Sequence, residues 1–80
     1  MTTDEVFEVI KGAIVLVMEV DPGTVARDTR LAEDLRCDSL ALVEIADVVE
    51  ERIAGLTIED AALDDISTVG QACDYVVARA

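Results

Sequence analysis

The chain has 80 residues, of which 18 are acidic and 6 are basic, so its formal net charge is −12. A chain of this length forms one domain, at a size where a single hydrophobic core only just offsets chain entropy. Nucleic acids and anionic membranes bind proteins through Lys and Arg, so neither is an expected partner. The same charge suits short encounters with basic patches on other proteins, although it also keeps a small protein soluble.

The residue types that are scarce exclude further classes of function. The chain has no histidine, only one lysine and two cysteines, Cys37 and Cys73. These numbers argue against zinc binding, a disulfide framework, and acid–base or nucleophilic catalysis. The first residues are acidic, and the longest apolar run, at residues 13–18, is too short to span a bilayer. We therefore expect a soluble, cytosolic protein that is not an enzyme.

The first predicted element is a helix that begins at a capping box formed by Thr2 and Glu5. The residues that follow separate on a helical wheel into one apolar and one charged side. Val15 falls among the charges, and a strand over residues 13–17 is excluded because no second strand exists to pair with it. The predicted apolar arc consists of Val6, Phe7, Val9, Ile10, Ala13, Ile14, Leu16, Val17 and Met18.

Residues 21–23, Asp-Pro-Gly, are predicted to end this helix, because Pro lacks a donor and Gly permits turn geometry. Residues 24–36 show little periodicity and are predicted to form a long loop. Long loops in compact domains are usually functional or mobile. The loop residues expected to pack on the core are Val25, Leu31 and Leu35.

Three further helices complete the predicted all-α fold. One runs from about residue 39 to 53, with Asp38 as its N-cap, and ends before Gly55. A short helix covers about residues 59–63, and the last begins with a second capping box, Thr68 to Gln71. The expected architecture is a four-helix bundle with a long first loop and a short third helix. The residues predicted to face the core are Leu42, Ile45, Ala46, Val49 and Ile53, then Val69, Ala72, Cys73, Val76 and Val77.

Ser39 is the residue that most invites a functional interpretation. It stands in the first turn of a predicted helix, off the apolar face, so its hydroxyl is open to a modifying enzyme. A phosphodiester formed there would lie beside unpaired backbone N–H groups and the positive end of the helix dipole. The alternative is that Asp38 and Ser39 only cap the helix, and the pair taken alone favours capping.

Residues 31–40, Leu-Ala-Glu-Asp-Leu-Arg-Cys-Asp-Ser-Leu, with the Val-Glu pair at 43–44, resemble the phosphopantetheine attachment region of acyl carrier proteins. The resemblance continues to the closing residues 66–76, and the family fold agrees with the predicted bundle. It implies that a phosphopantetheinyl transferase attaches 4'-phosphopantetheine from coenzyme A to Ser39, with Asp38 aiding recognition. The thiol of that arm would hold an acyl group as a thioester, which the protein would shelter and deliver.

The same resemblance places a docking surface on the second helix, for basic patches of acyltransferase, ketosynthase or ligase-type enzymes. Charged helix faces are usually just solvated, but Leu40 and Val43 lie among the carboxylates, which suits a contact site better. We expect the protein to act as a monomer. The candidate docking residues are Leu40, Val43, Glu44, Asp47, Glu50 and Glu51, with Asp60 and Asp64 in the third helix.

Some positions depart from the family pattern. Arg36 stands where the family usually has glycine, Ala41 replaces a common acidic residue, and Asp47 replaces an apolar one. About one residue is added near residues 54–57. These departures leave the attachment chemistry intact, and they suggest a dedicated pathway rather than housekeeping fatty acid synthesis.

Other interpretations stay open. An aminoacyl or peptidyl carrier typically has His or another residue at the position of Asp38, so Asp38 and the acidic second helix favour the acyl carrier. An unmodified acidic interaction module is the third class. The pathway, in fatty acid, polyketide or related specialised biosynthesis, is open too. Cys37 is either an exposed thiol, able to form a disulfide or attack the thioester, or an inert loop residue, which we favour; Cys73 is core packing.

Overall fold

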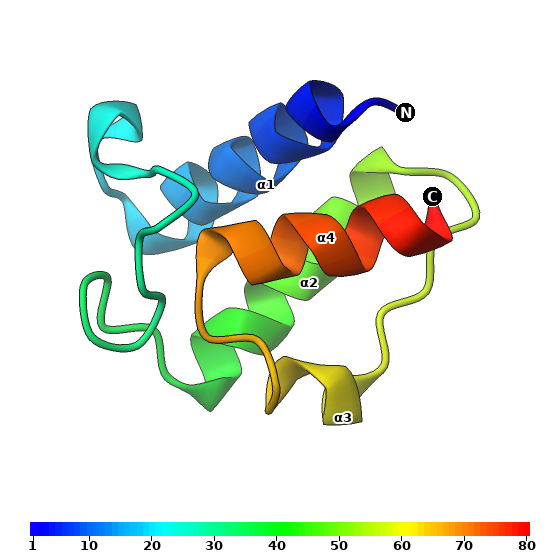
Figure 1. Ribbon diagram of the computed structural model, residues 1–80. Helices are drawn as coiled ribbons and strands as arrows, with labels where there is room; N and C mark the ends of the chain where they lie inside the picture. Colours follow the sequence, from blue (N-terminus) through cyan, green and yellow to red (C-terminus); the bar gives the residue numbers. More distant parts are fainter.

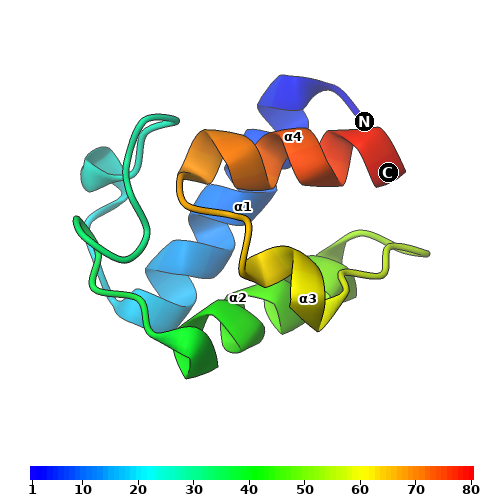
Figure 2. The ribbon, with the colours of Figure 1, turned by 60° about the horizontal axis from the view of Figure 1, so that its bottom comes forward.

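Three long helices and one short helix make up the computed structural model, which describes residues 1–80 (Figure 1). The long helices are α1 (Thr3–Met18), α2 (Ser39–Arg52) and α4 (Val69–Arg79), and α1 packs against both of the others. The short helix α3 (Asp60–Leu63) lies beside α2. Both chain ends lie at the end of the bundle opposite the first loop (Figures 1 and 2). The predicted all-α bundle is therefore confirmed.

The helices begin at the caps that the sequence predicts. Thr2 accepts a hydrogen bond from the Glu5 N–H at 3.2 Å, and the Glu5 carboxylate accepts one from the Thr2 N–H at 2.8 Å. Thr68 and Gln71 make the same reciprocal pair at the start of α4. At the start of α2, Asp38 accepts from the Ala41 N–H at 2.8 Å. These bonds satisfy N–H groups that a helix start otherwise leaves unpaired.

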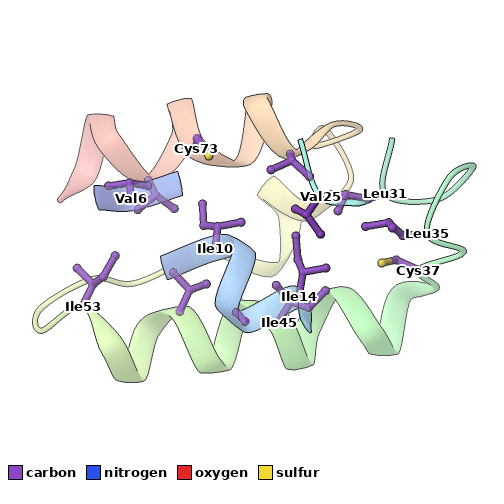
Figure 3. Packing of buried hydrophobic residues seen from close by; sticks show 14 of the residues in the cluster. Val6, Ile10, Ile14, Val25, Leu31, Leu35, Cys37, Ile45, Ile53 and Cys73 are labelled. Carbon is purple, nitrogen blue, oxygen red and sulfur yellow. The ribbon is translucent and has the colours of Figure 1, made fainter. Parts of the chain in front are cut away.

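The core lies between α1, α2 and α4 and is closed at one side by the first loop (Figure 3). It is built almost entirely from aliphatic side chains, as the composition predicts. Leu42, Ala72 and Val77 were expected to be buried but are only partly buried. The largest side chains that are completely buried are Ile14, Val6, Val49, Val69 and Cys73.

Two predictions about α1 are wrong. Leu16 was placed on the apolar arc, but its side chain is 59% exposed. At about 100° per residue, Leu16 lies about 200° past the buried Ile14, on the opposite side of the helix. The helix also ends before the Asp-Pro-Gly sequence, because Glu19 takes a left-handed conformation (φ 56°) as the C-cap. Residues Pro22–Thr24 form a short 3-10 turn, η1, instead.

The first loop is fastened to the start of α4 by bonds that the sequence did not predict. The Leu31 N–H donates to the Ser67 carbonyl at 2.9 Å, and the Gly70 N–H donates to the Arg27 carbonyl at 2.7 Å. A Cβ at Gly70 would lie 3.0 Å from that carbonyl oxygen, so glycine permits this approach. Val25, Leu31 and Leu35 are buried, as predicted. The loop is thus held by its bonds to the start of α4 and by its side chains in the core. It sets the position of the residues before α2.

None of the helices has the length and apolar composition that crossing a membrane would require.

Candidate functional site

The start of α2 presents Ser39 to solvent. Ser39 is exposed, and its hydroxyl makes no hydrogen bond within the protein. The Asp38 carboxylate satisfies the Ala41 N–H, but no protein group accepts from the backbone N–H of Ser39 or of Leu40. Two donors and the positive end of a 14-residue helix therefore face the surroundings of the Ser39 hydroxyl. These residues could hold an anionic group covalently linked to Ser39.

Two hollows in the surface meet at Ser39. One, of about 290 Å³, lies between α2 and α3, and the other, of about 410 Å³, lies toward the first loop. Both are lined by Ser39, Leu42, Leu63 and Asp64. An extended chain attached to Ser39 could therefore leave the serine along either side of the α2–α3 contact.

Behind these hollows lies an apolar pocket with a volume of about 40 Å³. Leu42 and Leu63 line the pocket as well as both hollows, so their side chains separate it from the surface beside Ser39. This volume exceeds what one water needs but is small for a chain of several methylene groups. All of its lining residues are hydrophobic: Ile10, Ile14, Leu31, Leu42, Ile45, Ala46, Val49, Ile58, Leu63, Ile66, Ala72, Tyr75 and Val76.

The predicted docking residues fall into two groups. Leu40, Glu44, Asp47 and Glu51 are exposed on α2, with Leu40 exposed over 67% of its surface. Val43 is partly buried and lines the hollow between α2 and α3, where it meets Asp60 and Asp64. These seven side chains thus lie at the surface of α2 and α3, with Leu40 next to Ser39 and Glu51 about 18 Å farther along α2.

Glu50 is the exception, and its predicted place on the exposed side of α2 is wrong. It is half-buried, and its carboxylate accepts a hydrogen bond from the Ile58 N–H at 2.8 Å. On a helical wheel it lies about 100° from Glu51, toward the segment that leads into α3. Glu50 therefore has a structural partner within the chain, which the other acidic residues of α2 lack.

Cys37 is buried, with 6% of its surface exposed, and it contributes to the core cluster (Figure 3). Burial, and then the neighbouring Asp38 carboxylate, raise the pKa of its thiol. The protonated thiol is a poor nucleophile. The interpretation of Cys37 as an exposed, reactive thiol is therefore wrong, and the interpretation as an inert residue is the one that fits. Cys73 is completely buried, as predicted.

The sequence did not identify Leu63 as a site residue. It was predicted only as part of a short helix, although the single leucine of this four-residue helix, followed by two aspartates, signals a packing contact. Its role depends on α3 lying against α2, which no local pattern specifies. The sequence had likewise placed Leu42 in the core without showing that it borders the surface at Ser39.

Comparison with known proteins agrees with this geometry. Residues 8–76 match the family model described as a phosphopantetheine attachment site. The chain is 43% identical over 76 residues to an acyl carrier protein of Petrotoga mobilis, covering 95% of this chain and 88% of that protein. It is 36% identical to acyl carrier proteins of Thermotoga maritima, over 91% of this chain and 89% of that one, and of Lactobacillus acidophilus, over 95% and 94%. The chain therefore belongs to the acyl carrier protein family, whose members are phosphopantetheine-bearing carriers and not enzymes.

Proposed function

We propose that Ser39 is the attachment site of the phosphopantetheine arm and that this chain delivers acyl groups carried on that arm. The single observation that carries the proposal is the exposed Ser39 hydroxyl at the start of α2, beside two unpaired backbone N–H groups. Asp38 directly precedes it and is exposed, so a transferase can contact both side chains at once. When bound, the arm supplies a thiol that holds the acyl group as a thioester.

The apolar pocket supports a sheltering role for the core. Its wall toward Ser39 consists of Leu42 and Leu63, and α3, which carries Leu63, has only four residues and no side-chain cap. Elements with few contacts open at low free energy. Movement of α3 away from α2 would therefore enlarge the pocket and admit part of an acyl chain.

Partner enzymes would dock on the acidic surface of α2. We define this docking surface as Leu40, Val43, Glu44, Asp47 and Glu51, with Asp60 and Asp64 of α3 at its edge. The exposed Leu40 would fill an apolar hollow on the partner while the carboxylates steer basic residues toward it. Glu50 is left out because its carboxylate is already bonded to the Ile58 N–H. The expected partners are the transferase, then acyltransferase, ketosynthase or ligase-type enzymes.

The departures at Arg36, Ala41 and Asp47 support service in a dedicated polyketide or related pathway rather than in housekeeping fatty acid synthesis. Full support of a complete fatty acid elongation cycle by this protein would contradict that assignment. Both cysteines are free thiols, which is consistent with action as a monomer in the reducing cytoplasm.

The test of the attachment is the intact mass of the purified protein after incubation with coenzyme A and a promiscuous phosphopantetheinyl transferase. We expect a single phosphopantetheine, located at Ser39 by fragmentation, and none on a Ser39→Ala variant of unchanged helix content. Modification of that variant, or an unmodified wild-type sample beside a fully modified control carrier, would contradict the proposal. The second outcome would favour an armless interaction module.

A further inference from the structure

Arg36 combines an unfavourable backbone with a position three residues before Ser39. Its φ angle is 59°, in the left-handed region that glycine occupies freely and that L-residues with a Cβ rarely adopt. A non-glycine residue in such a conformation persists only where the surrounding structure holds it there, as at Glu19, the C-cap of α1.

The two neighbours of Arg36 hold it in place. Leu35 and Cys37 are both buried, with 9% and 6% of their surfaces exposed. The Cys37 N–H also donates to the Leu31 carbonyl at 2.9 Å. Arg36 itself is exposed between these two anchors. Its backbone cannot relax without withdrawing a buried side chain, so the fold presents the arginine outward from a fixed point.

The guanidinium of Arg36 has no anionic partner in a chain that carries 18 acidic residues. No carboxylate lies within 4.0 Å of it, and it makes no side-chain hydrogen bond. The nearby Arg30, by contrast, pairs with Glu33 and Asp34. The Arg30 N–H and then its side chain hold the pKa of Asp34 below its usual value. The charge of Arg30 is thus already neutralised, and Arg36 is the unpaired cation closest in sequence to Ser39.

We propose that Arg36 is a positioning residue for the arm, whose guanidinium pairs with the phosphodiester on Ser39. The inference rests on the proposed attachment at Ser39. Three residues span at most about 11 Å between Cα atoms, and an arginine side chain covers most of that distance. The phosphodiester adds a negative charge beside Asp38, and Arg36 offsets it. Because guanidinium and phosphate oxygens match in a bidentate geometry, the pairing also restricts the direction in which the arm leaves Ser39.

The experiment compares two-dimensional NMR spectra of the ¹⁵N-labelled protein before and after modification with coenzyme A and a transferase. The Arg36 Nε–Hε signal should shift on modification, and the shift should shrink as salt approaches about 1 M, where the Debye length is about 3 Å. Arg52 is the internal control, since it also lacks an ion pair but ends α2 at the other end of the helix. Its signal should stay unchanged.

Two variants complete the test. Arg36→Gln removes the charge and keeps the left-handed backbone with a Cβ, so the ³¹P signal of its arm should differ from that of the wild type. Arg36→Lys keeps the charge but not the bidentate geometry, so its ³¹P signal should lie between those of the wild type and of Arg36→Gln. A change seen equally in Gln and Lys variants would overturn the pairing, because it would reflect the backbone alone.

The outcomes for Arg36 and for Ser39 are separable. A mass increase with a shifted Ser39 amide signal, but an unmoved Arg36 Nε–Hε signal, would overturn the pairing and leave the attachment intact. The absence of any mass increase would overturn both. An Arg36 signal that moves only when a partner enzyme is added would also overturn the pairing, and would assign this cation to a carboxylate on the partner.

Discussion

The start of α2 differs from the start of α4. α4 begins with a capping box between Thr68 and Gln71, and its next two donors, the N–H groups of Val69 and Gly70, donate to carbonyls of the first loop. α1 has a capping box too, but no protein group accepts from its first two helical N–H groups. α2 begins with one side-chain cap, from Asp38, and leaves the N–H groups of Ser39 and Leu40 unpaired. The difference separates a helix start whose backbone donors are all paired within the protein from one that keeps hydrogen-bonding capacity for another molecule.

What holds the start of α2 in place is the first loop rather than a second cap. Leu35 and Cys37 are buried just before it, and the loop is bonded to the residues that begin α4. Because this support comes from the buried side, the solvent-facing side of the start of α2 stays free to contact another molecule. Substitutions at the start of α4 should therefore change stability, whereas substitutions around Ser39 should change recognition.

The largest effect on recognition should come from reversing charge on the docking surface. We expect the double variant Glu44→Lys, Glu51→Lys to lower the transferase kcat/KM about thirtyfold, equivalent to ~2 kcal/mol, because two steering carboxylates become repulsive. The dependence of the rate on salt should weaken as well. Stopped-flow or fixed-time mass measurements at several salt concentrations would show this.

A matched control separates docking from net charge. Asp4→Lys with Glu8→Lys makes the same charge change on α1, near the chain end opposite the first loop (Figure 1). This variant should keep a kcat/KM within about threefold of the wild type, since Asp4 and Glu8 lie outside the docking surface and exposed charges are screened by salt. Equal losses in the two double variants would show that net charge, and not the docking surface, governs recognition.

Asp38→Asn should have the next largest effect. Asn caps helices about as well as Asp, so the free energy of unfolding should change by less than ~0.5 kcal/mol. The lost charge should lower the transferase kcat/KM about tenfold, or ~1.4 kcal/mol. Urea unfolding and the modification assay on the same sample give both quantities. If stability falls while the modification rate holds, Asp38 is a cap and nothing more.

The start of α4 should respond in the opposite way. Thr68→Ala removes the hydroxyl that accepts from the Gln71 N–H, and should lower the free energy of unfolding by about 1 kcal/mol. For a domain of this size, that corresponds to a fall in Tm of roughly 4–8 °C. The modification rate measured well below the Tm should stay at the wild-type value, and Thr68→Ser should keep most of the stability. A slower modification of Thr68→Ala would mean that the two kinds of helix start are not independent.

The part of this picture that the sequence predicts is local. Capping boxes join residues three apart, and an apolar helix face repeats every three or four residues. The caps at Thr2, Asp38 and Thr68 and the buried side of α2 could therefore be predicted from the sequence. Ser39 followed from the resemblance together with its place in the first turn. The error at Leu16 came from drawing the apolar arc too wide, which a stricter helical wheel would have avoided.

The features that the sequence did not predict depend on the paths of the loops in the folded protein. The bond from Gly70 to Arg27 joins residues 43 positions apart in the chain, and the bond from Ile58 to Glu50 depends on how the chain turns after α2. The burial of Cys37 and the left-handed backbone of Arg36 are set by the same tertiary packing. Residue type carries little information about such conformations, because several neighbours fix them together.

The smallest expected effect is a change in the free energy of unfolding on substitution of Arg36, in the segment that holds the start of α2. Arg36→Gly should raise the free energy of unfolding by about 0.5 kcal/mol, because relief of the left-handed strain slightly exceeds the entropy that glycine loses on folding. Arg36→Ala keeps the strain and should show no such gain, so the difference between the two in urea unfolding isolates the backbone contribution. A Gly variant less stable than the Ala variant by about 0.5–1 kcal/mol, the entropy that glycine loses on folding, would mean that Arg36 is unstrained. A gain for Gly would mean that Arg36, three residues before Ser39, lowers stability, which fits a side chain retained for the arm.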